Sequence, residues 1–174
     1  ASLGDPDIFK IDLLWPIVRK LEEVSGHDYQ ASKQAFQVIT DHLKSAFWLG
    51  VDGIRPSNTA QGYVMRRLIR RAVRFGLSLG VTEGLSMPVV SVVRDIYQDD
   101  YPEVVKEFAT VSQAMLNEEV AFRRTLNKGL KELEKISGQL TPSPTREGAK
   151  GARSISGHDI FKLKDTYGFP MELT

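Results

Sequence analysis

The chain has 174 residues, a formal net charge of +1 and no cysteine, and 41% of its residues are hydrophobic. This composition is typical of a globular protein with a substantial buried core, and it excludes a disulfide framework and a cysteine-ligated zinc site. The three histidines are too far apart to form an HxxxH or HExxH motif, and no apolar run approaches the roughly 18–20 residues that cross a bilayer. We therefore expect neither a bound metal nor a membrane partner.

Two helical patterns open the chain. Apolar residues recur at helical spacing over 13–24, where Pro16 fits only in the first turn. A second pattern follows Ser32, a candidate N-cap, and ends near Gly50. His42 lies close to the apolar face of the second helix, and we interpret it as a buried, hydrogen-bonded side chain rather than a catalytic one. Both helices are expected to be scaffold.

A short loop leads from the second helix to the third. Asp52-Gly53 favours a turn, and Pro56 biases the residue before it towards an extended conformation. Asn58 stands at the end of this loop and has two interpretations. It is either an N-cap, whose loss costs about 1 kcal/mol, or an amide that donates and accepts at a base edge. The spacing alone favours the cap.

The third helical segment, 62–76, concentrates the basic residues. At about 100° per residue, it separates into a face of five arginines and an opposite, apolar face that we expect in the core. The apolar face consists of Val64, Met65, Leu68, Ile69, Ala72, Val73 and Phe75. We call the five arginines the arginine stripe: Arg66, Arg67, Arg70, Arg71 and Arg74.

No acidic residue lies between Arg55 and Gly80, so the stripe has no carboxylate at i±3 or i±4 within its own helix. Without the six arginines of this region, the chain has 17 basic residues against 22 acidic ones. A local positive surface on a mildly acidic body suits recognition of a phosphate backbone. Pairing of the arginines with acids from other helices is an equally open alternative at this point.

The remaining helices lie downstream of the stripe. Ser86 as N-cap and Pro88 in the first turn predict a short helix that ends before residue 99. A long amphipathic pattern then runs from Glu103 to about Ile136, roughly 50 Å at 1.5 Å per residue. Gly129 is a weak point within it. Such a rod suits a strut between domains or one arm of an RNA clamp.

The last part of the chain changes in composition. Residues 137–153 are rich in Gly, Pro, Ser and Thr, which predicts a flexible linker or loop. Residues 154–174 predict a short C-terminal helical segment that packs back on the helical domain. The predicted fold class is all-α, with a helical nucleic-acid-binding domain over 1–136. The absence of an initiator Met suggests a piece of a longer chain.

No catalytic motif is recognisable in the chain. It lacks a GxxxxGK[ST] phosphate-binding loop, a GxGxxG dinucleotide motif and a GxSxG nucleophile elbow. The residues alone therefore predict a helical module that binds nucleic acid through one basic helix. The alternative is a free-standing adaptor that binds other proteins, with the arginines as interface anchors.

Three blocks of this sequence, in the same order, resemble the alanyl-tRNA synthetase family of bacterial and eukaryotic type. The first combines 40–44, Asp52-Gly53 and 56–58 with the run 62–74, the second is Phe122-x-x-Thr-Leu-x-x-Gly129, and the third is the Asp-Thr-Tyr-Gly-Phe-Pro of 165–170. One departure is Gln61, because the family usually has Arg immediately before the Gly-Tyr-Val.

The resemblance implies a place within a larger protein. The chain would be the helical tRNA-recognition segment between a class II catalytic domain, which uses ATP and Mg, and an editing domain, which binds zinc. The parent would be a cytoplasmic alanine–tRNA ligase that attaches alanine to tRNA(Ala). The fragment itself would be inactive, with no catalytic residue, cofactor or metal of its own.

The resemblance also implies site residues. The segment would bind the acceptor stem of tRNA(Ala) and read its G·U wobble pair, with Asn58 and Asp165 in the base-reading positions and the arginine stripe on the backbone. A G·U wobble leaves the guanine 2-amino group unpaired in the wide minor groove of A-form RNA. The Asp165 carboxylate could accept from that group, and the Asn58 amide could use acceptors nearby.

Overall fold

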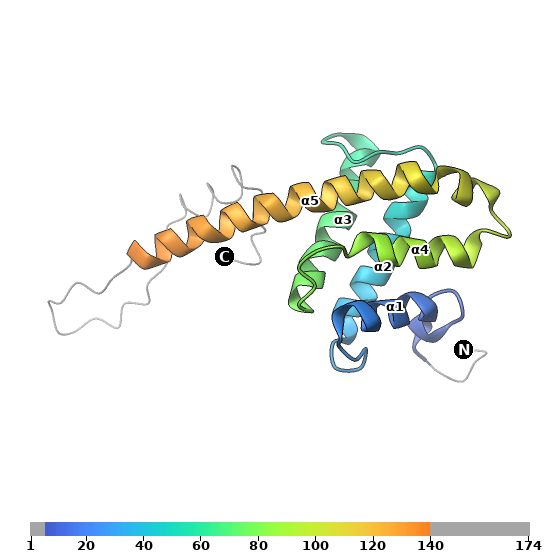
Figure 1. Cartoon of the computed structure of the whole chain (residues 1–174), viewed down its shortest axis with the longest axis horizontal. Helices are drawn as coiled ribbons and strands as arrows, with labels where there is room; N and C mark the ends of the chain where they lie inside the picture. Colours follow the sequence, from blue (N-terminus) through green and yellow to red (C-terminus); the bar gives the residue numbers. More distant parts are fainter. Residues whose placement is uncertain (1–5, 140–174) are drawn as a thin grey trace, which may run out of the picture. The chain divides into compact units, whose positions relative to one another are not determined.

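The computed structural model describes residues 6–139, with side chains as far as 131. Across this range the chain forms a 3-10 turn and five α-helices, with no strand (Figure 1). They are η1 (Ile8–Lys10), α1 (Trp15–Ser25), α2 (Lys33–Val51), α3 (Ala60–Ser78), α4 (Ser86–Tyr97) and α5 (Pro102–Gln139). The predicted all-α class is confirmed.

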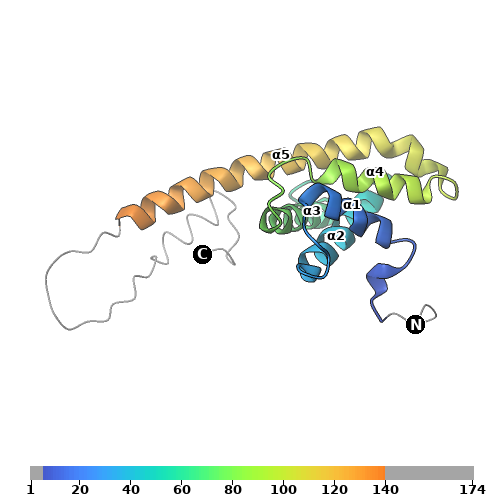
Figure 2. The ribbon, with the colours of Figure 1, turned by 60° about the horizontal axis from the view of Figure 1, so that its bottom comes forward.

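The chain divides into two compact units, Ala1–Val120 and Ala121–Thr174, and the core described here belongs to the first. α2 and α3 lie side by side at its centre, with α1 and α4 packed around α2 (Figure 2). All of these helices contribute fully buried apolar side chains, namely Ile17 and Leu21 of α1, Phe36, Ile39, Leu43 and Phe47 of α2, Met65 and Ile69 of α3, and Val89 and Val93 of α4. Because these residues recur every three or four positions within each helix, every helix turns one apolar stripe inwards.

Gly50 permits a close approach between α2 and the first part of α5. A Cβ atom at this position would lie only 2.4 Å from Cγ1 of Val111. Gly50 was predicted to end α2, but the helix continues to Val51. Its missing side chain instead allows α5 to cover the core.

The ends of the helices follow the sequence only in part. α1 has Pro16 in its first turn and ends at Gly26, whose φ of 69° is in the left-handed region. Ser32 occupies the N-cap position of α2 but makes no side-chain capping hydrogen bond. His42 is half-buried, with Nδ1 3.0 Å from the carboxylate of Asp41.

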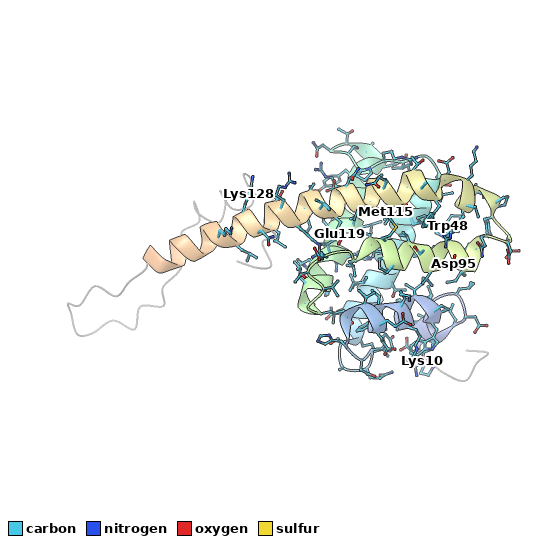
Figure 3. All side chains as sticks on the ribbon, in the orientation of Figure 1. Lys10, Trp48, Asp95, Met115, Glu119 and Lys128 are labelled. Carbon is cyan, nitrogen blue, oxygen red and sulfur yellow. The ribbon has the colours of Figure 1, made fainter. Side chains whose placement is uncertain are left out.

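The N-terminus of α4 is capped from a distance. Ser86 was predicted as its N-cap, but Ser86 is the first helical residue. The carboxylate of Glu119 in α5, labelled in Figure 3, accepts the backbone N–H groups of Leu85 and Ser86, each at 2.9 Å, and the Ser86 hydroxyl. The predicted cap is wrong because a buried carboxylate from another helix occupies the position that a local side chain would take.

α5 is longer than predicted. It runs through Gly129 without interruption and ends at Gln139, beyond the predicted end at Ile136 and inside the predicted linker. The rest of that linker and the predicted C-terminal segment, with Asp165, lie outside the described residues. No helix in the described part of the chain is both long and apolar enough to span a membrane.

Candidate nucleic-acid interface

α3 buries a narrower face than the sequence predicted. Its buried side chains are Met65, Ile69, Ala72 and Val73, together with the two helical glycines. Val64 was expected in the core, but 51% of it is exposed, as is 49% of Tyr63. Val64 points about 100° away from Met65 around the helix, so it falls beside the arginine stripe rather than opposite it.

Two arginines of the stripe share one carboxylate. Nε of Arg66 and Nε of Arg70 lie 3.0 Å and 2.7 Å from the same oxygen, Oε1 of Glu118. The two arginines are one helical turn apart, so both reach the same side of α3. The Glu118 side chain is only 9% exposed, whereas those of Arg66 and Arg70 are 25% and 28% exposed. For these two arginines, pairing with an acid from another helix is therefore the correct interpretation.

The other three arginines have different surroundings. The Arg67 guanidinium lies 5.8 Å from the ring centroid of Tyr63, one turn earlier, and that of Arg74 lies 5.4 Å from the ring of Phe75. Arg67 and Arg71 are exposed, and Arg74 is half-buried. Within residues 6–131, Arg71 has no hydrogen bond or ion pair. Arg67 and Arg71 are thus the most accessible cations of the stripe.

Asn58 does not cap α3. The N-cap residue is Thr59, which makes no side-chain capping hydrogen bond, and the Asn58 side chain instead accepts from Nη1 of Arg66 through its Oδ1. The cap interpretation is therefore wrong, and the amide is exposed beside the stripe.

Backbone contacts hold the loop that carries Asn58. The N–H of Ser57 donates to the carbonyl of Gly62 at 3.1 Å. Nη1 of Arg55 donates to the carbonyls of Gly50 and Ile54 at 2.7 Å and 2.9 Å. Arg55 is one of the six arginines of this basic region, but its guanidinium group binds backbone carbonyls and so stabilises the loop. Gln61 is exposed in the first turn of α3.

This surface has the chemistry of an anion-binding site. It combines guanidinium groups, one exposed amide and one exposed aromatic ring. The buried carboxylate of Glu118 pairs with two of the five arginines of the stripe. Guanidinium groups donate in a planar fork that matches phosphate oxygens. Among the described residues, no three His, Asp or Glu side chains gather closely enough to hold a metal ion.

The sequence is similar to known proteins along almost its entire length. The model of the family described as tRNA synthetases class II (A) matches residues 5–174, so the chain belongs to that family. Similar proteins include alanine–tRNA ligases from Bacillus pumilus (41% identical over 172 residues), Halalkalibacterium halodurans (42% over 172) and Bacillus subtilis (40% over 172). Each alignment covers 97% of this chain and 19% of the relative. The resemblance to alanyl-tRNA synthetases is confirmed, and the chain spans about a fifth of the length of these relatives.

Proposed function

We propose that this chain is the tRNA-recognition segment of an alanine–tRNA ligase and that α3 binds the acceptor stem of tRNA(Ala). The observation that carries the proposal is the contact of the exposed Asn58 amide with Arg66 of the arginine stripe, in a chain of the class II tRNA synthetase family. That family membership argues against the alternative of a free-standing protein adaptor.

The arginines and the two base-reading residues have separate roles in this proposal. Contacts with phosphate and ribose position a nucleic acid, whereas contacts with base edges carry sequence information. Arg67 and Arg71 hold the stem through its backbone, and Arg66, Arg70 and Arg74 add positive charge on the same face of α3. Asn58 and Asp165 read the G·U wobble pair from the minor groove.

The chemistry of aminoacylation belongs to the rest of the parent protein in this proposal. A class II catalytic domain uses ATP and Mg to activate alanine, and an editing domain holds zinc, as the resemblance to the family implies. The parent works in the cytoplasm. The described residues contribute recognition and positioning of the tRNA.

Binding of this chain to two acceptor-stem hairpins, one with G·U and one with G·C at the same position, tests the proposal. We expect tighter binding to the G·U hairpin, and we expect Asn58→Ala or Asp165→Ala to remove that preference. Equal binding of the unaltered chain to both hairpins would overturn the base-reading role.

A further inference from the structure

We propose that Glu118 is a positioning residue for base recognition. Through Arg66 it fixes the orientation of the Asn58 amide, so that the amino group of Asn58, with its two N–H donors, is turned towards the RNA. This inference rests on the proposed function and assigns a role to a residue in α5 that need not touch the RNA itself.

The first step is the geometry of Arg66. Its Nε is held at 3.0 Å by Oε1 of Glu118, and its Nη1 donates to Oδ1 of Asn58. A guanidinium group is planar and rigid, so fixing Nε also fixes the direction in which Nη1 points. Glu118 therefore determines the position of Nη1 of Arg66, the donor to Asn58.

The second step is the identity of the Asn58 atom that faces Arg66. The carbonyl and amino ends of an asparagine side chain are nearly alike in shape, but a guanidinium group has donors and no acceptor. Only the carbonyl oxygen can satisfy it. The amino group, with its two N–H donors, consequently faces away from Arg66.

The third step concerns the RNA. With the oxygen turned towards Arg66, the amino group is the end of the amide that is free to face the RNA. It can donate to the acceptors of the minor groove, which are purine N3, pyrimidine O2 and ribose oxygens. This sharpens the earlier expectation that the Asn58 amide both donates and accepts. In this arrangement the acceptor for the guanine 2-amino group is another residue, the role that the proposed function assigns to Asp165.

The burial of Glu118 explains why this arrangement can persist in the free protein. Its side chain is 9% exposed and bonds two arginines through one oxygen. Arg66 and Arg70 would otherwise repel each other and turn towards solvent or the nearest phosphate. In some proteins a buried charge holds one particular conformation and thereby contributes to specificity.

The test compares Glu118→Gln with Glu103→Gln, which removes an exposed carboxylate from the same helix. Loss of a negative charge next to the stripe should leave overall RNA affinity unchanged or higher. The ratio of affinities for G·U and G·C hairpins should nevertheless fall about tenfold in Glu118→Gln, the discrimination expected of one well-placed base contact. Glu103→Gln should keep the ratio.

A second variant tests whether Glu118 acts through Asn58. Asn58→Asp keeps an oxygen for Arg66 but removes both donors, so it should lose the preference. Adding Glu118→Gln to that variant should cause no further loss, because the two residues act on the same contact. Independent, additive losses would overturn the proposal.

A measurement without RNA separates this proposal from the proposed function. The side-chain amide NMR signals of Asn58 in the free protein should shift and average in Glu118→Gln but not in Glu103→Gln. Unchanged signals would refute the positioning role even if the RNA preference were present. Shifted signals without any RNA preference would support the network and refute its use in base reading.

Discussion

Gly62 is the residue that allows the Asn58 loop to lie against α3. A Cβ atom at this position would be 2.2 Å from Oγ of Ser57 and 2.5 Å from the carbonyl oxygen of Arg55. The carbonyl of Gly62 also accepts the N–H of Ser57. No residue with a side chain can occupy this position without moving the loop.

We expect Gly62→Ala to destabilise the protein by about 1–3 kcal/mol through this overpacking. The expected loss is net of the higher helix propensity of alanine, about 1 kcal/mol. Urea denaturation would measure it. Gln61→Ala is the matched control, because Gln61 is exposed in the same helical turn and should be neutral or slightly stabilising. Equal stability of both variants would contradict the close approach.

Among the residues that the structure describes, Asp7 has a clearly shifted pKa. Burial raises the pKa of its carboxyl, but hydrogen bonds from Lys33, Tyr29 and the N–H of Phe9, together with the Lys33 charge, outweigh that effect. Nζ of Lys33 and the hydroxyl of Tyr29 lie 2.9 Å and 2.8 Å from the carboxylate. The net result is a pKa below the ordinary value of 3.8.

A lowered pKa in the folded state stabilises the protein above pH 3.8, and this contribution is lost as the pH falls through the folded-state pKa. We expect Asp7→Asn to lower the free energy of unfolding at neutral pH by about 1–3 kcal/mol. The difference from the unaltered protein should shrink in acid. Urea denaturation at several pH values would show this, with the exposed Asp12→Asn as control. A difference independent of pH would contradict the assignment to the Asp7 charge.

At the scale of the helix, local sequence patterns predicted the positions of the helices well. They predicted less well which groups form hydrogen bonds with the backbone at the helix ends. The apolar spacing predicted α1, α2 and α3, because each helix buries one face. The cap of α4 was missed because Glu119 is 33 residues away from Ser86 and no local motif links the two. A remote carboxylate can be found only when the packing of α5 is known.

We expect Glu119→Gln to destabilise the protein by about 2–4 kcal/mol, because it removes a buried charge that accepts three hydrogen bonds and turns an amide donor towards them. Chemical denaturation would measure the loss. Glu83→Gln, an exposed substitution in the loop before α4, should stay within about 0.5 kcal/mol. If Glu119→Gln left the free energy of unfolding unchanged, the cap would contribute little to stability.

The arginine stripe shows the same limit of sequence reasoning. Its position on one face of α3 and the exposure of Arg67 and Arg71 follow from helical periodicity. The shared partner of Arg66 and Arg70 does not, since Glu118 is 52 and 48 residues away from them. Val64 was misassigned because periodicity gives the direction of a side chain but not the width of the buried face.

At the scale of the whole molecule, net charge is a poor guide to the binding surface. The chain carries a net charge of +1, yet one helix holds five arginines, and the buried Glu118 pairs with two of them. RNA affinity should therefore depend on particular arginines rather than on the total charge. Salt dependence can distinguish them.

Each phosphate contact releases condensed counterions, so the logarithm of the affinity falls linearly with the logarithm of the salt concentration. Arg71 is exposed and has no ion pair or hydrogen bond within the described side chains, whereas Arg70 is committed to Glu118. We expect Arg71→Ala to reduce the salt slope by about one unit and Arg70→Ala to reduce it less. Binding should weaken equally for G·U and G·C hairpins in Arg71→Ala.

Lys20→Ala on α1 is the control for loss of a positive charge elsewhere, because Lys20 pairs with Glu23 on its own helix. It should leave the slope unchanged. If Arg70→Ala flattened the slope as much as Arg71→Ala, Glu118 would have to release Arg70 when RNA binds. Arg70 would then be a phosphate ligand in the complex, and the Glu118 contacts would describe only the free protein.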